Sequence, residues 1–237
     1  MSSSESDTPT DTENDTDIDP TSKSERTRTH LRELALESFR TRGYDATTMR
    51  LLATEAGVSV GTTNYHFASK VDLVQELYLD VQERHRAAAE PLLQDETDLV
   101  ARLKIVYSTG LDQLQPYHAH AAEFVSAALA PNSPINPLSV ESSPARGITE
   151  ALFAEAVEGA RASLPDRIAA ELPRVLFVAH LLLALYWAYD DSPRQKRTRT
   201  LLSRGLSLLK IGLPLTRLPL LRRPMADLLA LMGDVRS

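Results

Sequence analysis

Residues 47–70 of this 237-residue chain read TTMRLLATEAGVSVGTTNYHFASK, the most informative part of the sequence. Its first half spaces apolar residues three and four positions apart, which predicts a short helix with one buried face. These residues are Met49, Leu52, Ala53 and Ala56. We expect Thr47 to cap this helix, Gly57 to supply the positive φ of a turn, and Ser59 to cap a second helix. The pattern predicts a helix-turn-helix.

The second helix of the pair, residues 60–66, has a thin apolar face and many short polar groups. Hydroxyls, an amide, a phenol and an imidazole follow one another within it. Such groups can reach the phosphates and base edges of a DNA major groove. The composition therefore indicates a helix that reads DNA.

Charge is divided unevenly along the chain. The net charge is −6, but residues 1–20 carry seven Asp or Glu and no Lys or Arg, so the remainder carries +1. Residues 21–70 carry eight Lys or Arg against five acids. This local positive balance favours attraction to phosphates. The acidic segment lacks the apolar residues that would offset the entropy lost on ordering, so we expect it to be disordered. Its role is either that of a solubilising tail or that of a competitor of DNA for the basic face.

Composition argues against several other classes of protein. The chain has no cysteine, which excludes disulfides and thiolate metal sites. Its longest apolar run, residues 175–189, is shorter than the roughly 20 residues of a membrane-spanning helix. The serines have no nucleophile-elbow context and no glycine-rich phosphate loop is visible. We therefore expect a soluble cytoplasmic protein that is not an enzyme and needs no cofactor and no metal.

With the preceding helix, this stretch resembles the DNA-binding domain of the tetracycline-repressor (TetR) family, over about residues 26–80. The positions that carry the resemblance are Phe39, Gly43-Tyr44, Thr47-Thr48, Ala53, Glu55-Ala56-Gly57-Val58-Ser59, Gly61, Asn64-Tyr65-His66-Phe67 and Ser69-Lys70. Two positions depart from the family pattern. Thr63 replaces a larger aliphatic residue, and Asn64 replaces a common tyrosine.

The resemblance implies a DNA-binding role for ten residues. Val60, Gly61 and Thr62 match the end of the reading helix that meets bases. The other positions match phosphate contacts or the local frame of the reading helix, and they are Thr47, Thr48, Ser59, Asn64, Tyr65, His66 and Lys70. Arg26 and Arg28, on the preceding helix, are expected either to touch the DNA backbone or to form a solvated face.

The rest of the chain predicts further helices and no convincing strand, so the fold class is all-α. Helices are expected at about 24–42, 69–93, 98–115, 117–130, 144–162, 166–190, 193–212 and 225–233. Residues 131–144, with four prolines and four serines, are expected to form a mobile loop. The expected organisation is an acidic tail (1–22), a DNA-binding domain (23–70), a helical regulatory and dimerisation domain (71–213) and a C-terminal extension (214–237).

Dimerisation is expected through the helices at about 166–190 and 193–212. The first is apolar nearly all round and must be covered on both sides. The second offers Leu201, Leu202, Leu206, Leu209 and Leu213. In the TetR family two such helices from each subunit form a four-helix interface; the alternative is that one chain covers both faces itself. A homodimer on a palindromic operator in double-stranded DNA is the implied assembly.

An effector site is expected inside the helical body. The candidate lining residues are Tyr107, Leu111, Phe124, Phe153, Phe177 and His180. This set favours a small apolar or aromatic effector that releases a repressor from its operator. The alternative is a DNA-binding regulator controlled by a protein partner or by the acidic tail. Two weaker hypotheses are a metal held by His118, His120 and Glu123, and a membrane or anionic partner for the basic residues after Ser192.

Overall fold

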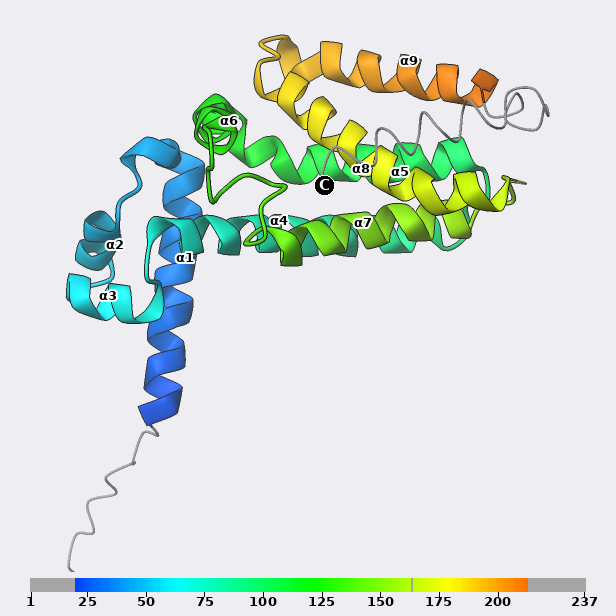
Figure 1. Ribbon diagram of the computed structural model, residues 1–237. Helices are drawn as coiled ribbons and strands as arrows, with labels where there is room; N and C mark the ends of the chain where they lie inside the picture. Colours follow the sequence, from blue (N-terminus) through cyan, green and yellow to red (C-terminus); the bar gives the residue numbers. More distant parts are fainter. Residues whose placement is uncertain (1–19, 163, 213–237) are drawn as a thin grey trace, which may run out of the picture.

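The computed structural model describes residues 20–212 except residue 163, and these residues contain helices, turns and loops but no strand (Figure 1). The α-helices are α1 (Pro20–Ala46), α2 (Met49–Glu55), α3 (Val60–His66), α4 (Lys70–Leu93), α5 (Leu99–Leu114), α6 (Ala121–Leu129), α7 (Ser143–Glu158), α8 (Asp166–Ala188) and α9 (Lys196–Gly212). Short 3₁₀ helices at Gln115–His120 and Pro193–Gln195 precede α6 and α9. The expected all-α fold is confirmed.

Helices α1 to α3 form one end of the molecule, and α4 leads from them into the body (Figure 1). Apolar residues of α1 pack with those of α2 and α4 in one core, around Leu31, Phe39, Leu52 and Leu73. Gly43 interrupts α1 with φ 84° and ψ −173°, as expected for the residue that stops the first helix. The chain therefore turns there and enters the helix-turn-helix.

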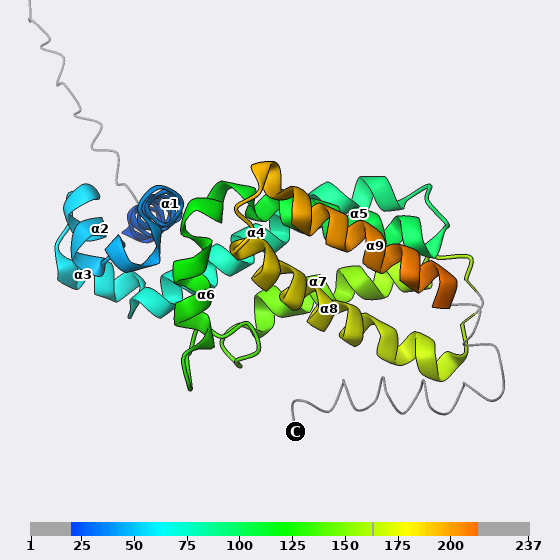
Figure 2. The same ribbon diagram turned by 90° about the horizontal axis from the view of Figure 1, so that it is seen from above.

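The body is a second core formed by α4, α5, α7, α8 and α9. Helix α4 packs against both α5 and α7, and α7 packs against α8. Helix α9 packs on α5 and α8 and runs alongside α5 (Figure 2), on the side away from α7 (Figure 1). Helix α6 contacts both α1 and α8, so it joins the two ends of the molecule.

The helix boundaries correct several expectations. Helix α1 begins at Pro20 rather than near Ser24, so residues 20–22 are helical and not part of a tail. A 3₁₀ helix occupies the start of the segment where we expected a continuous helix from Tyr117. Residues 1–19 and 213–237, with the expected tail and C-terminal extension, lie outside the described residues.

The proline-rich loop is anchored rather than free. Its Ile135 is buried, and the Ile135 carbonyl accepts a hydrogen bond of 2.9 Å from the hydroxyl of Tyr78 on α4. Gln75, also on α4, donates to the Pro134 carbonyl at 3.1 Å. The expected mobile loop is therefore a packed segment, because one apolar side chain and two α4 donors hold it.

A buried guanidinium ties three segments of the body together. Arg102 on α5 donates to the carbonyls of Leu93, Glu96, Glu155 and Ala156 at 2.5–2.8 Å. Leu93 ends α4, and Glu155 and Ala156 lie in the last turn of α7. Carbonyls at helix C-termini lack intrahelical partners and carry partial negative charge. They therefore satisfy the charge of Arg102 without a carboxylate.

The turn between α8 and α9 is fixed by one carboxylate. Asp190 accepts hydrogen bonds from the backbone N–H and hydroxyl of Ser192, and from those of Thr198, at 2.6–3.0 Å. Burial alone raises the pKa of Asp190, but these four hydrogen bonds outweigh it and hold that pKa below its usual value. The expected compact turn between the two helices is confirmed.

Helix α8 is the most apolar element of the body. Its residues Ile168–Ala188 are long and apolar enough to cross a membrane by length and composition alone, which corrects the shorter span expected from the sequence run. One side of α8 lies in the core through Leu176, Phe177 and Trp187. Leu182 and Tyr186 remain exposed on the other side.

Candidate nucleic-acid interface

Helix α2 is capped by Thr48 and not by Thr47. The Thr48 hydroxyl accepts the backbone N–H of Leu51 at 3.1 Å. Thr47 is fully buried, where its hydroxyl donates to the Gly43 carbonyl at 2.7 Å and lies 2.8 Å from the hydroxyl of Ser38. The expectation that Thr47 caps α2 is therefore wrong. Its side chain is also closed to a phosphate, because it ties α1 to the start of α2.

The turn between α2 and α3 follows the sequence expectation. Gly57 has φ 66°, and the backbone N–H of Val58 donates to the Ala53 carbonyl at 3.0 Å. Ser59 caps α3, since its hydroxyl accepts the N–H of Thr62 at 2.9 Å. Thr63, one of the departures from the family pattern, is fully buried and donates to the Ser59 carbonyl at 3.2 Å. This local hydrogen bond satisfies the Thr63 hydroxyl, so a polar residue is accommodated on the buried side of α3.

The outward surface of α3 brings together most of the predicted reading residues. Val60, Gly61, Asn64 and Tyr65 are exposed, and the Tyr65 side chain is 81% exposed. The rings of Tyr65 and His66 meet edge to face with centroids 5.1 Å apart. A large exposed phenol on a soluble helix is available to a partner rather than to the core.

Lys70, at the start of α4, is partly engaged within the protein. Its ammonium lies 3.7 Å from the centre of the Tyr44 ring, a cation–π contact. Partial burial lowers the pKa of Lys70, against the opposing pull of Asp45 and Glu123. Lys70 therefore lies at the start of α4, close to the end of α3, and its ammonium also contacts the Tyr44 ring.

The arginines of α1 have a role that the sequence left open. Arg28 forms an ion pair with Glu76 on α4 and lies 4.8 Å from the centre of the Phe67 ring. Arg32 donates to Glu76 at 2.9 Å and to Asp80 at 3.2 Å. These pairs fasten α1 to α4 beside the helix-turn-helix. Only the spacing of the two acids on one face of α4 signals them in the sequence.

The contact between α6 and the break in α1 was not predicted. His120 and Glu123 share a hydrogen bond of 2.9 Å, and Glu123 also accepts the backbone N–H of Asp45 at 3.3 Å. The other ring nitrogen of His120 lies 3.2 Å from the Thr41 carbonyl. We call Gly43, His120 and Glu123 the α1–α6 joint. No local sequence signal marks it, because its partners are about 80 residues apart.

The suggested metal ligands diverge. His118 lies 3.0 Å from the Trp187 carbonyl on α8 and 3.2 Å from the Gln195 amide nitrogen. His120 and Glu123 turn instead toward α1. Within residues 20–212 as described, no group of three or more His, Cys, Asp or Glu side chains is placed to hold a metal ion.

The predicted effector residues separate into two cores. Five of them, namely Tyr107, Leu111, Phe153, Phe177 and His180, lie in the core of the body, each at most 4% exposed. Phe124 is the exception. Its ring packs edge to face against the rings of Phe39 and Tyr44, with the ring centroids 5.5 Å apart in both pairs, in the core next to the helix-turn-helix. The placement of Phe124 in an effector site was therefore wrong.

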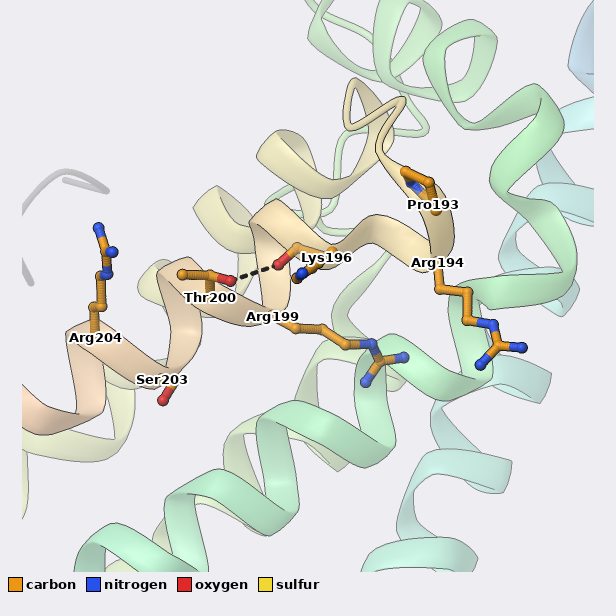
Figure 3. A pocket seen from close by; sticks show the side chains of 7 residues that line it. All are labelled: Pro193, Arg194, Lys196, Arg199, Thr200, Ser203 and Arg204. Carbon is orange, nitrogen blue, oxygen red and sulfur yellow. Dashed lines mark hydrogen bonds between the residues drawn. The ribbon is translucent and has the colours of Figure 1, made fainter.

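Two surface hollows on the described residues lie elsewhere. The larger, about 550 Å³, is an open basic surface at the start of α9 (Figure 3). It is lined by Pro193, Arg194, Lys196, Arg199, Thr200, Ser203 and Arg204. Arg199 is paired with Asp112 of α5 at 2.7 Å, and the Thr200 hydroxyl donates to the Lys196 carbonyl at 2.8 Å. The smaller, about 330 Å³, lies on α1.

Comparisons with known proteins cover both halves of the chain. Residues 31–77 match the family of bacterial regulatory proteins of the tetR type, and residues 102–221 match the tetracyclin repressor-like C-terminal domain. The HTH-type transcriptional repressor KstR2 of Mycobacterium tuberculosis is 32% identical over 92 residues, which are 39% of this chain and 46% of that protein. KstR2 of Mycolicibacterium smegmatis is 29% identical over 92 residues, 39% of this chain and 45% of that protein. The chain thus spans about half the length of the curated relatives it matches.

Solved structures share the fold over most of the chain. A TetR-family regulator from Syntrophomonas wolfei superposes with a TM-score of 0.60 at 14% identity, covering 79% of this chain and 96% of that one. One from Streptomyces coelicolor has a TM-score of 0.58 at 18% identity, covering 88% of each chain. These identities are low and show a shared fold. Together with the two matched domains, they show that the chain belongs to the TetR family of bacterial regulatory proteins.

Proposed function

We propose that this protein is a cytoplasmic transcriptional repressor that binds an operator in double-stranded DNA through α3. The observation that carries the proposal is the exposed N-terminal end of α3, held rigid by the Ser59 cap. Val60 and the Thr62 methyl group offer apolar contact to thymine methyl groups, and Gly61 allows close approach of the backbone. A rigid, exposed helix end with small side chains suits the major groove.

Contacts to phosphates set the register of this helix. Tyr65 and His66 on α3, Thr48 at the start of α2 and Lys70 at the start of α4 carry hydrogen-bond donors. Thr47 is not among them because its hydroxyl is buried. The relatives named as transcriptional repressors match part of this chain, which supports the same activity here.

A pair of substitutions separates base reading from phosphate binding. Thr62→Ala is expected to change the preferred base at one operator position, by about 1 kcal/mol, because a base contact is lost. Tyr65→Phe is expected to weaken binding to all operator variants by a similar factor, because a phosphate contact carries no sequence information. Fluorescence anisotropy against a panel of single-base operator variants measures both effects.

The control for these substitutions is Thr200→Ala on α9, whose hydroxyl bonds its own helix far from α3. It should bind every DNA as the wild type does. If Thr62→Ala also keeps the wild-type preference at every position, Thr62 does not read a base.

We propose a homodimer formed by the outer faces of α8 and α9. The exposed apolar residues on these faces are Leu182, Tyr186, Tyr189, Leu201, Leu208 and Ile211. Leu202, Leu206 and Leu209 do not contribute to this face, because they pack on the core of their own chain, and Leu213 lies outside the described residues. Several large apolar side chains left exposed on neighbouring helices favour a protein interface there.

Leu182→Glu is expected to dissociate this dimer. The residue is 59% exposed in one chain, so the change is tolerated by the folded subunit but places a charge in the centre of the interface. Dimer affinity should fall by about 30-fold or more, as for an interface hot spot. Sedimentation equilibrium measures it. The matched control, Leu92→Glu on α4, replaces a leucine that is 55% exposed away from this face and should leave the dimer intact.

We further propose that a small ligand in the core of the body controls DNA binding. Helix α8 contacts α6, and the α1–α6 joint connects α6 to α1 beside the helix-turn-helix. A ligand that favours a different position of α8 would thus shift the population of orientations of the helix-turn-helix. The rival is control by a protein partner or by the acidic tail, in which case the five core residues stay packed as they are. Stabilisation of the protein by a small ligand, with loss of operator affinity, decides between them.

A further inference from the structure

Among the described residues two buried side-chain atoms lack a hydrogen-bond partner: Gln195 Oε1, in the turn before α9, and His180 Nδ1, in the core of the body. His180 on α8 is 4% exposed, and its Nδ1 is a buried nitrogen without a hydrogen-bond partner within the described residues. Leaving a buried donor or acceptor unpaired costs about 1–3 kcal/mol. Native proteins contain few such groups, and each calls for a physical reason.

Aromatic rings from three other helices surround His180. Its ring centre lies 6.0 Å from that of His85 on α4, 6.1 Å from Tyr107 on α5 and 5.9 Å from Phe153 on α7. On the α5 side, a Cβ at Gly110 would stand only 2.9 Å from the His180 ring, so glycine is required there. The unpaired nitrogen therefore lies where four helices of the body meet.

The neighbouring polar groups are already paired. The Tyr107 hydroxyl donates to the Leu176 carbonyl at 2.9 Å. One nitrogen of His85 lies 2.8 Å from the Val106 carbonyl and the other 3.2 Å from the Gln82 amide. Because these groups are bonded to other partners, they do not supply a hydrogen bond to His180 Nδ1. The partner that Nδ1 lacks is therefore either a buried water or a bound ligand.

The charge around His180 restricts the chemistry of such a ligand. Burial, reinforced by the neighbouring His85, lowers the pKa of His180 to about 3, so the ring is neutral. The buried cation of the body, Arg102, is fully used by four carbonyls. A carboxylate or phosphate placed beside His180 would lose its hydration without an opposite charge in return.

We propose that His180 Nδ1 is the polar anchor for an uncharged, mainly apolar ligand that carries a hydroxyl group. A hydroxyl both donates and accepts, so it pairs with Nδ1 in either tautomer of the ring. The surrounding aromatic rings receive the apolar part of the ligand. This inference rests on the proposed ligand control of DNA binding and names the chemical class of the ligand.

Three probes that share one ring system test the inference: naphthol, methylnaphthalene and naphthoate, substituted at the same position. Titration calorimetry on the full chain should show naphthol binding about tenfold more tightly than methylnaphthalene, the ratio that one hydrogen bond provides. Naphthoate should bind more weakly than naphthol. In His180→Phe the advantage of naphthol should disappear while methylnaphthalene still binds. Equal binding of naphthol and methylnaphthalene to the wild type, or a preference that survives in His180→Phe, overturns the proposal.

Stability supplies a second measurement. His180→Phe removes an unpaired atom and should unfold at the same or higher urea concentration than the wild type. His85→Phe is the matched control, because that ring is stacked on His180 with both nitrogens paired, and it should unfold at lower urea. If His180→Phe is destabilised as much as His85→Phe, then Nδ1 is paired in solution, for example by a buried water, and the proposal fails.

DNA binding separates this inference from the proposed function. The same preparations are titrated with operator DNA in the presence and absence of naphthol. Operator binding without binding of any probe rejects the ligand class and leaves the DNA-binding function standing. Failure of the wild-type protein to bind any DNA sequence specifically rejects the proposed function itself.

Discussion

Replacing Arg102 by methionine is expected to lower the free energy of unfolding by about 4 kcal/mol. The change removes the donors for four carbonyls, two of them in the last turn of α7 and one at the end of α4. Methionine fills part of the space but offers no donor. The expected loss is large because the bonds to the Leu93 and Ala156 carbonyls are buried and those to the Glu96 and Glu155 carbonyls are partly buried.

Urea denaturation at a fixed protein concentration measures this effect, since the stability of a dimer depends on concentration. Arg86→Met is the matched control. Arg86 also contacts Glu155, but through the side-chain carboxylate and on the surface, where the ion pair is about 34–40% exposed. Its removal should cost less than about 1 kcal/mol. Similar losses for the two variants would show that Arg102 does not hold the three segments together.

Replacing Gly43 by alanine is expected to damage both stability and DNA binding. Gly43 has φ 84° and ψ −173°, a region open essentially to glycine. A Cβ there would also lie 2.3 Å from Glu123 Oε2 and 2.5 Å from His120 Nδ1. The backbone strain and the steric collision together should lower the free energy of unfolding by about 3 kcal/mol. Because the α1–α6 joint must open, operator affinity should fall by tenfold or more.

Gly57→Ala separates backbone strain from the collision. Gly57 also has a positive φ, 66°, but nothing lies within 4 Å of the position its Cβ would take. It should lose only about 1 kcal/mol of stability. Thermal unfolding and operator titration of both variants measure the contrast. Equal losses at the two glycines would mean that strain alone acts at Gly43 and that the joint does not position the reader.

The helix-turn-helix could be predicted because its signals are local. Gly57 and Ser59 act on residues within three or four positions of themselves, and both behave as expected. The neighbouring residues alone do not determine whether Thr47 or Thr48 caps α2. It depends on Ser38, nine residues earlier, which takes the Thr47 hydroxyl into the core.

Packing between distant segments could not be predicted either, because it also depends on residues that lie far apart in the sequence. The apolar pattern of α6 predicts that Phe124 is buried but not which core receives it, and the ring packs against Phe39 rather than near Tyr107. Arg102 looks like an ordinary helical arginine in the sequence. Its role arises only when two helix C-termini meet around it. The five remaining core residues of the predicted effector site do lie together, since helical spacing already placed them on inward faces.

Two copies of α3 in the proposed dimer should read a symmetric site in DNA. Selection of bound sequences from a random DNA pool, using the full chain, measures this. The selected sequences should contain an inverted repeat, with half-sites spaced to match the two reading helices of the dimer. Enrichment of a single half-site, or no enrichment over the starting pool, would contradict this expectation.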